Sequence, residues 1–392
     1  MIAADSTAAL ARGRVIHDAD SHVMETGDWL VPFVDPRHRE KVASLFGNGA
    51  SPVDKIIEEA RKRKTNPQAN AKAVENPIAG IKGWGAYGAF DSEERRALLD
   101  LLGLSSQLIF PTAGVGPLHA AKDEETRYAM ARAYNRSIAA FCSLSRLIAV
   151  GYVPLDNAEL ALEEARRAID EGCGAIMFPS GPAGDHSPGH PVLDGFWRLL
   201  SESHVPFLLH IGAGTRTQPK AFRNNGRKRA PDLHGGGENL RFCDYIMLWY
   251  APQVFLTAMI YDGVFERFPN LRGGVIESGA GWVPDFLRQL DLAWKSFSRT
   301  DPYLKELSMM PSAYLRRAIK FTPFPGEDVG LMIREAGPDL FMFSTDYPHP
   351  EGTKDPLGRF ERTMTDVDDS AKDKFYRSNF EAMMQMPTPA HA

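Results

Sequence analysis

Short apolar segments alternate with amphipathic segments along most of this chain. A first strand begins at Val15 and ends in a run of polar residues, and regular alternation resumes at residue 91. Seven further apolar strands are predicted over 104–110, 147–153, 175–178, 206–211, 271–276, 319–322 and 340–344. Most intervening segments carry apolar residues at helical spacing, which predicts helices over 91–103, 123–144, 157–171, 196–203, 255–268, 283–297 and 329–336.

Eight short strands separated mostly by helices predict a parallel sheet. Eight such units predict an α/β fold of the (β/α)8 TIM-barrel type, with an open, doubly wound sheet as the alternative. No GxGxxG motif follows the first strand, so the sequence gives no support for dinucleotide binding.

The segment 31–90 interrupts the alternation and is polar and glycine-rich over 66–89. We interpret it as a segment inserted after the first strand of a single domain that spans residues 1–392, because loops of this length are usually functional or disordered. Its aromatic residues and Lys82 either cover a pocket or belong to a plain surface excursion, and the second interpretation is preferred.

The composition is that of a globular protein, with 43% hydrophobic and 24% charged residues. A formal net charge of −5 gives no reason to expect nucleic acid as a partner. Cys142, Cys173 and Cys243 lie far apart without CxxC spacing, which predicts reduced thiols. There is no signal-peptide pattern, and no apolar run approaches the ~18 residues that cross a bilayer. We therefore expect a cytoplasmic protein without a membrane partner.

Acidic residues and histidines lie where the predicted strands end. Alternation places Asp18, Asp20 and His22 on one face of the first strand. Later strands end at His210, at Glu277 and, three residues apart, at Asp346 and His349. Taken singly, each of these residues also suits a cap, a turn or a satisfied core histidine. Taken together at the carboxyl ends of barrel strands, they predict a divalent metal site.

These segments resemble the amidohydrolase superfamily, specifically the amidohydrolase-related group that includes aminocarboxymuconate-semialdehyde decarboxylase. The resemblance is carried by Asp18–His22, His210, Gly263–Leu271, Glu277–Trp282 and Ser344–His349, which together span nearly the whole chain. The segment Gly263–Leu271, GVFERFPNL, is the most specific of them.

The resemblance implies one metal ion, and the matching positions assign its ligands as Asp20, His22, His210 and Asp346. The chain departs from the group where Glu277 stands in place of an acid/base histidine. The expected ion is zinc, with manganese and iron as alternatives. Asp18, Glu277 and His349 are candidates for a second ion or for supporting the ligands. A small-molecule substrate and a homodimer or higher homo-oligomer are also implied.

The leading hypothesis is a metal-dependent hydrolase that acts through an activated water on a small carboxylated or amide-bearing substrate. Asp346 is the candidate general base and Glu277 the second acid/base. The alternatives are a non-oxidative decarboxylase of a small aromatic or unsaturated acid, a non-haem iron oxygenase and a catalytically silent metal-binding subunit. Arg216 is predicted to clamp a substrate carboxylate, and Trp282 and Phe178 to form an apolar wall.

Overall fold

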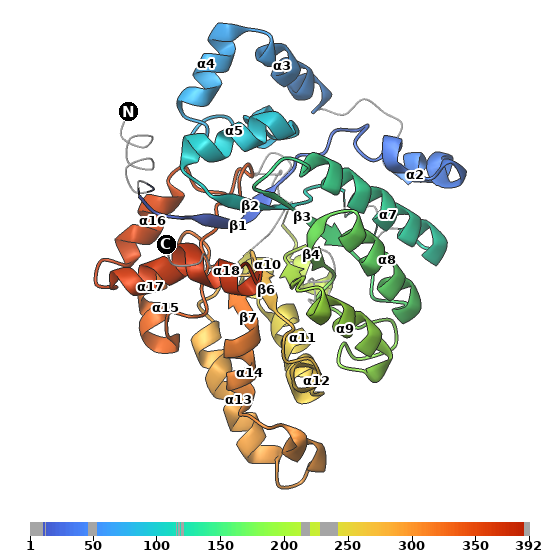
Figure 1. Ribbon diagram of the computed structural model, residues 1–392, viewed down its shortest axis with the longest axis vertical. Helices are drawn as coiled ribbons and strands as arrows, with labels where there is room; N and C mark the ends of the chain where they lie inside the picture. The colour runs from blue at the N-terminus through green and yellow to red at the C-terminus, as the bar shows by residue number, and fades with distance from the viewer. Residues whose placement is uncertain are drawn as a thin grey trace.

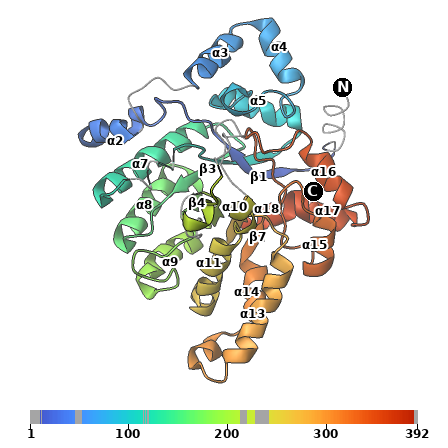
Figure 2. The same ribbon diagram turned by 180° about the vertical axis from the view of Figure 1, so that it is seen from behind.

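The computed structural model describes residues 11, 13–45, 53–114, 116, 118, 121–212, 220–227 and 242–387. Seven parallel strands form one curled sheet in the order β1 to β7, and helices surround it (Figures 1 and 2). The strands are β1 (His17–His22), β2 (Ser106–Phe110), β3 (Leu147–Tyr152), β4 (Cys173–Met177), β5 (Phe207–His210), β6 (Gly273–Ile276) and β7 (Ile319–Phe321). All seven lie where the sequence predicted strands, which confirms the α/β class.

The helices around the sheet include at least one in each of the seven predicted ranges. They are α5 (Ser92–Leu102), α7 (Glu124–Phe141), α8 (Ala158–Asp170), α9 (Asp194–Glu202), α10 (Phe242–Ile246), α11 (Tyr250–Tyr261), α12 (Val264–Arg267), α13 (Val283–Phe297), α14 (Pro311–Ala318), α15 (Val329–Ala336), α16 (Pro356–Thr363), α17 (Asp369–Asp373) and α18 (Asn379–Met383). The side chains of Asp91, Asp123 and Asn157 accept hydrogen bonds from backbone N–H groups in the first turns of α5, α7 and α8. The predicted helix 255–268 is two helices, because Gly263 adopts a φ of +72° and ends the first.

The predicted eighth strand, 340–344, is not a regular strand. Its residues nevertheless bond to both edges of the sheet: Phe321 N donates to Leu340 O at 2.8 Å, and Ala19 N donates to Phe343 O at 3.0 Å. Further along, Asp346 N donates to Asp20 O at 2.8 Å. Asp346 has a φ of +53°, so the backbone turns sharply just after this segment. The segment 340–347 therefore joins β7 to β1 and places its polar residues beside the end of β1.

The segment 31–90 is helical over much of its length. It contains η1 (Val31–Phe33), η2 (Pro36–His38), α2 (Arg39–Leu45), α3 (Asp54–Lys64), α4 (Pro67–Glu75) and η3 (Gly83–Gly85). The expected loop after residue 66 begins as α4, because the Asn66 side chain accepts from two backbone N–H groups and Pro67 fits the first turn. Helices α3 and α4 lie outside the ring of helices, beside α5 (Figure 1).

The end of this segment returns to the eighth-strand region. Gly83 N donates to Pro348 O at 2.8 Å, and Tyr347 Oη donates to Tyr87 O at 2.8 Å. Trp84 Nε1 donates to Glu25 O at 3.0 Å. These contacts place residues 82–88 beside the carboxyl ends of the strands, so the preferred interpretation of a plain surface excursion is wrong for this part.

No helix in the described part of the chain has both the length and the apolar character needed to cross a membrane. Cys142, Cys173 and Cys243 form no disulfide bond with one another.

Candidate metal centre

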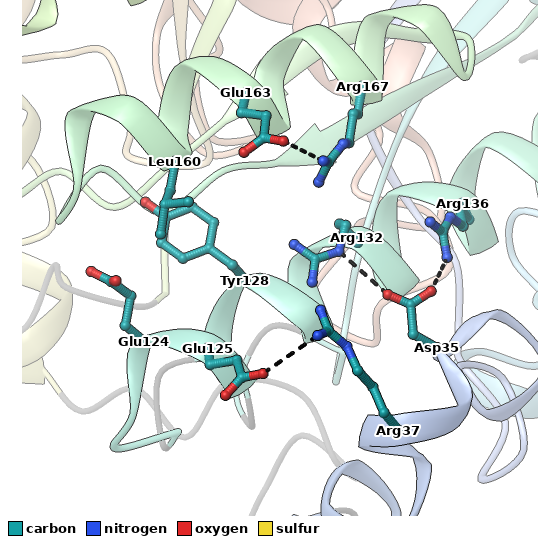
Figure 3. A pocket seen from close by; sticks show the side chains of 10 residues that line it. All are labelled: Asp35, Arg37, Glu124, Glu125, Tyr128, Arg132, Arg136, Leu160, Glu163 and Arg167. Atoms are coloured by element: carbon teal, nitrogen blue, oxygen red, sulfur yellow. Dashed lines mark hydrogen bonds and ion pairs between the residues drawn. The ribbon is translucent and has the colours of Figure 1, made fainter.

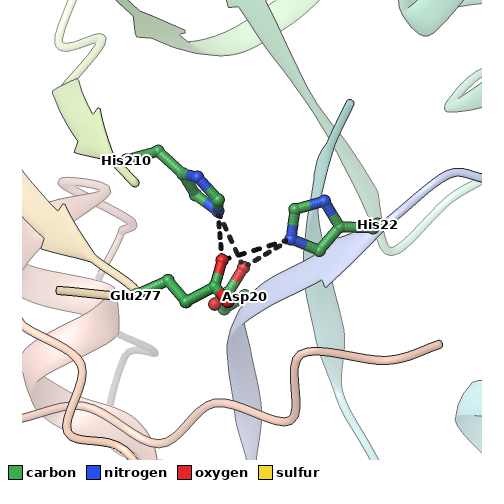
Figure 4. A group of neighbouring side chains, drawn as sticks. All are labelled: Asp20, His22, His210 and Glu277. Carbon is green, nitrogen blue, oxygen red and sulfur yellow. Dashed lines mark hydrogen bonds and ion pairs between the residues drawn. The ribbon is translucent and has the colours of Figure 1, made fainter. Parts of the chain in front are cut away.

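Four buried side chains meet at the carboxyl ends of three strands. Asp20 and His22 come from β1, His210 ends β5 and Glu277 follows β6 (Figure 4). His22 Nε2 lies 3.3 Å and His210 Nε2 3.4 Å from Asp20 Oδ1, and His210 Nε2 lies 3.4 Å from Glu277 Oε2. The four ligand atoms all lie within 4.8 Å of one another. We call Asp20, His22, His210 and Glu277 the inner group.

Both histidines of the inner group are oriented by backbone carbonyls. His22 Nδ1 lies 2.7 Å from Pro111 O, and His210 Nδ1 lies 2.8 Å from Ile211 O. A carbonyl only accepts, so each Nδ1 donates and each Nε2 carries the lone pair that faces the carboxylates. His22 Nε2 is shielded from solvent and has no hydrogen-bond partner among the described residues. This donor set fits a divalent ion, since neutral imidazole and carboxylate are its usual ligands.

A second set of ligand atoms adjoins the inner group. Asp346 Oδ1 lies 3.5 Å from His22 Nε2 and 2.8 Å from His349 Nδ1. Glu277, Asp346, His349 and Glu351 again present ligand atoms within 4.8 Å of one another, and we call them the outer group. Apart from Asp18, the candidate ligands therefore lie in one of the two groups, with Glu277 in both.

Two of these carboxylates are held in a backbone conformation that side chains other than glycine rarely adopt. Glu277 has a φ of +51° and Asp346 a φ of +53°. Left-handed conformation in such residues costs on the order of 1–3 kcal/mol and concentrates at functional sites. Here Thr322 Oγ1 accepts from Glu277 N at 2.9 Å, and Asp20 O accepts from Asp346 N. Sharp turns at both strand ends thus direct the two carboxylates toward the same place.

Asp18 supports the site without joining either group. Its carboxylate accepts from Thr345 N at 2.9 Å, Thr345 Oγ1 at 2.6 Å and Gln107 Nε2 at 2.8 Å. Burial raises the pKa of Asp18 to about 7, and the hydrogen bonds from Thr345 and Gln107 oppose that rise. Asp18 therefore ties the eighth-strand segment to β1, and its role in metal binding stays a prediction.

The groups at the centre shift one another's ionisation. Burial and the charge of His349 lower the pKa of His22 to about 3, so its imidazole is neutral at physiological pH. Burial would raise the pKa of Asp20, but His210 and His22 beside it lower it below its usual value. Burial raises the pKa of Asp346 to about 6 against the opposing charge of His349. Neutral imidazole and ionised carboxylate are the protonation states that bind metals.

The predicted substrate contacts are less well placed than the ligands. Phe178 is 1% exposed and packs among the rings of Phe196, Trp197, Phe207 and Phe255. Trp282 packs against Phe286 and Phe321 and donates from Nε1 to Gly279 O at 2.9 Å. Both positions are those of packing side chains, and their contact with substrate stays a prediction. Arg216 lies outside the described residues.

Sequence reasoning missed two residues around the centre and preferred a surface position for a third. Glu25 accepts backbone N–H groups of Thr112, Ala113 and Gly114 at distances of 2.9–3.2 Å, and so fixes the loop that orients His22. Its position three residues after His22, just past the carboxyl end of the first strand, was the available signal. The others are Glu351, in the outer group, and Lys82, whose Nζ is shielded from solvent without a hydrogen-bond partner among the described residues.

A separate pocket of about 610 Å³ lies at α7 and α8 (Figure 3). Its arginines are paired with carboxylates: Arg136 Nη1 lies 2.9 Å and Arg132 Nε 3.6 Å from Asp35, and Arg167 pairs with Glu163. No residue of the inner or outer group lines it. This pocket is therefore separate from the candidate metal ligands at the strand ends.

Comparison with known proteins supplies a family and a fold. The profile of a family described as Amidohydrolase matches residues 31–383, a range that begins after Asp20 and His22. An amidohydrolase from Mycobacterium avium subsp. paratuberculosis is similar in structure, with 21% identity, a TM-score of 0.73, and coverage of 95% of this chain and 99% of that one.

Two manganese-bound decarboxylases share the same architecture. The 5-carboxyvanillate decarboxylase of Novosphingobium aromaticivorans is 19% identical to this chain. The superposition covers 95% of this chain and 98% of the decarboxylase, with a TM-score of 0.62. The dihydroxybenzoic acid decarboxylase of Polaromonas sp. is 16% identical to this chain. The superposition covers 95% of this chain and 97% of that decarboxylase, with a TM-score of 0.61. At sequence identities this low, the structural similarity shows a shared fold alone.

Proposed function

This chain belongs to the amidohydrolase family, and on that premise we propose that it is a metal-dependent enzyme that decarboxylates a small aromatic or unsaturated acid without oxidation. The observation that carries the proposal is the convergence of the inner group and Asp346 on one place at the strand ends. The names of manganese-bound neighbours with the same fold favour decarboxylation over the hydrolysis that leads the sequence-based hypotheses.

We take the scaffold to be a (β/α)8 barrel whose eighth position is filled by the irregular segment 340–347. The backbone hydrogen bonds of this segment to β7 and β1 support that view. In such barrels the active site lies at the carboxyl ends of the strands, where both ligand groups are found. A homo-oligomer in the cytoplasm remains a prediction from the sequence.

The donor set favours manganese over the zinc expected from the sequence. Two imidazoles and three carboxylates make an oxygen-rich site, and carboxylate oxygen suits manganese while imidazole also suits zinc and iron. When bound, the ion supplies positive charge that attracts an anionic substrate and withdraws electron density from it.

The chain's own residues then handle the proton that decarboxylation requires. The bond between the substrate carbon and its carboxylate breaks, carbon dioxide leaves, and the electron pair stays on the carbon, which takes a proton. We assign that proton to Glu277, which replaces the acid/base histidine of the resembling group at the end of β6. Asp346 accepts the proton of a neighbouring hydroxyl and so favours the anionic form of the substrate.

Lys82 is the cation suited to the carboxylate of the substrate. Its ammonium lies 5.3 Å from the centre of the Tyr347 ring and interacts with the charges of Asp346 and Glu351. Burial lowers the pKa of Lys82 to about 8, against the opposing charge of Asp346. A buried ammonium without a hydrogen-bond partner is costly, and a substrate carboxylate would satisfy it.

The test is carbon dioxide release from protein loaded with Mn²⁺. The panel contains benzoates with a hydroxyl group next to the carboxylate, including 2,6-dihydroxybenzoate and 5-carboxyvanillate, on which decarboxylases of this fold are named as acting. We expect metal-dependent release that Asp346→Asn abolishes. Absence of release from the whole panel by fully loaded protein would contradict the proposal.

Hydrolysis is the second candidate, and Glu277 favours it. A carboxylate at this position, together with Asp346, can hold and deprotonate a water molecule beside the metal ligands. The same loaded protein should then cleave esters or amides of small acids and release no carbon dioxide. Exchange of Glu277→His separates the two candidates, because it restores the acid/base residue of the decarboxylases while removing the second carboxylate.

A further inference from the structure

A fully buried arginine on α5 lies beside the strand ends. The guanidinium of Arg95 pairs with no carboxylate in the described part of the chain, and its Nη1 is shielded from solvent without a hydrogen-bond partner there. Burial lowers the pKa of Arg95 to about 10, so the guanidinium stays charged at physiological pH. A buried charge without an opposite partner is costly, so the contacts that Arg95 does make call for a reason.

The guanidinium joins three segments that meet at the strand ends. Arg95 Nε donates to Gly88 O at 2.8 Å, and Nη2 donates to His22 O at 2.6 Å. Its Cζ lies 5.2 Å from the centre of the Tyr347 ring, which is the distance of a cation–π contact. A planar guanidinium can donate to two carbonyls while it lies on a ring, whereas an ammonium is a single point of charge. Arg95 therefore ties Gly88 and the Tyr347 ring to the end of β1.

The ammonium of Lys82 lies on the same ring. It is 5.3 Å from the centre of Tyr347, and Tyr347 Oη donates to Tyr87 O at 2.8 Å. We infer that Arg95 is a positioning residue for substrate binding, which fixes Gly88 and Tyr347 and thereby sets where the Lys82 ammonium lies relative to the metal ligands. The inference rests on the proposed role of Lys82 in binding a substrate carboxylate.

The start of α5 holds the end of the segment 82–88 closely. Gly88 has a φ of +72°, and a Cβ at this position would lie 2.5 Å from Arg95 N. Glu94 Oε2 accepts from Gly88 N at 3.0 Å, while Arg95 donates to the carbonyl of the same residue. Two consecutive residues of one helix thus hold both polar groups of Gly88. Removal of the guanidinium breaks one of these two bonds and the link from the segment to His22.

The metal ligand itself has supports that do not involve Arg95. His22 N donates to Tyr347 O at 2.7 Å, and His22 Nδ1 lies 2.7 Å from Pro111 O. The imidazole should therefore keep its orientation when Arg95 is replaced. Loss of Arg95 should act on substrate binding and leave the metal content unchanged.

The experiment compares Arg95→Met with wild type, both as the full chain loaded with Mn²⁺. Hydrogen–deuterium exchange should become faster at the Gly83 and Gly88 amides, which donate to Pro348 O and to Glu94. KM for a carboxylated substrate should rise about tenfold, as in Lys82→Met, while kcat and bound Mn²⁺ change little. In the variant that carries both substitutions, KM should rise no further than in Lys82→Met alone, because the two residues act through one contact.

Controls separate this role from a general effect on α5. Arg96→Met changes the next residue of the helix, which is exposed, and should alter neither exchange nor KM. If circular dichroism shows that Arg95→Met does not fold, Arg95→Lys keeps the charge without the planar fork and should show the same changes to a smaller extent.

Exchange at wild-type rates over residues 82–88 in the folded variant would overturn the inference, as would KM effects that multiply in the double variant. Faster exchange in the variant, together with no carbon dioxide release from wild type, would support the anchoring by Arg95 and contradict the proposed function alone.

Discussion

Two histidines at opposite ends of β1 have similar local surroundings and different tasks. His17 Nε2 lies 3.5 Å from Glu381 Oε1, and His22 Nε2 lies 3.3 Å from Asp20 Oδ1. The other ring nitrogen is also held in each case, since His17 Nδ1 lies 2.8 Å from Ser106 Oγ. Both side chains are buried. Residue type, burial and a nearby carboxylate therefore do not distinguish them.

What distinguishes the two histidines is the origin of their neighbours. His17 stacks on Phe380 of α18 with ring centroids 4.7 Å apart, and its carboxylate partner Glu381 comes from the same helix. His22 faces carboxylates from the ends of β1 and β6 and from the eighth-strand segment. Parallel strands bring their carboxyl ends to the same edge of the sheet, so polar groups distant in sequence gather there. The position of a histidine at the carboxyl end of a strand, rather than its residue type, therefore distinguishes a candidate metal ligand from a packing residue.

Replacing His22 should have the largest effect on metal binding and activity. Replacing His17, at the other end of β1, should not have this effect. His22→Ala removes an inner-group ligand, so bound Mn²⁺ should fall by at least one ion per chain. Loss of the ion removes several kcal/mol of transition-state stabilisation, which is on the order of 10³-fold in rate. His17→Ala is the matched control and should retain full metal content. Unchanged metal in His22→Ala would break the comparison.

Glu25 tests whether the loop that orients His22 matters as much as the ligand itself. Its carboxylate holds the N–H groups of residues 112–114, next to Pro111 O, which orients His22. Glu25→Gln places an amide donor against those N–H groups. We expect Mn²⁺ affinity to fall about 10–100-fold, the usual cost of losing a partner that orients a ligand.

The control for Glu25 is another buried glutamate, away from the site. Glu164→Gln changes a carboxylate that accepts from Asn135 Nδ2 at 2.8 Å, and it should leave Mn²⁺ affinity unchanged. Equal affinities in wild type and Glu25→Gln would show that the loop orients His22 without this carboxylate.

Lys82 tests whether the strand-end face also binds the substrate anion. Lys82→Met keeps the length of the side chain and removes its charge. A charge-assisted hydrogen bond contributes about 1.5–3 kcal/mol, so KM for a carboxylated substrate should rise about tenfold or more while kcat changes little. Lys354→Met, at an exposed position nearby, should leave KM unchanged. A fall in kcat alone would assign Lys82 to the chemical step instead of to binding.

The sequence predicted the strands and the ligand positions because both are local patterns. Apolar strands that end in Asp, Glu or His are visible without knowing the fold, as at His210 and Glu277. The irregularity of the eighth strand could not be predicted, because the contacts beside it join residues distant in sequence, as the hydrogen bond from Thr345 N to Asp18 does across 327 residues. Glu25 was missed, and the surface position was preferred for Lys82, because their roles depend on loops that meet only in the folded chain.

The smallest expected effect lies at His17 and concerns stability alone. Burial lowers the pKa of His17, with the charge of Glu381 opposing the shift. As the pH falls through about 6.5, the unfolded chain binds a proton at this histidine while the folded chain does not, so the free energy of unfolding decreases.

His17→Gln should remove that dependence and lower stability at pH 8 by about 1 kcal/mol, the size of a lost stacked pair. Denaturant unfolding of both proteins at pH 5 and pH 8 measures the difference, with His186→Gln, at an exposed position, as the control. The free-energy difference between wild type and His17→Gln should shrink from pH 8 to pH 5, because wild type alone loses stability there. A loss of bound Mn²⁺ in His17→Gln would mean that the amino end of β1 also acts on the metal centre, and the contrast between the two histidines would fail.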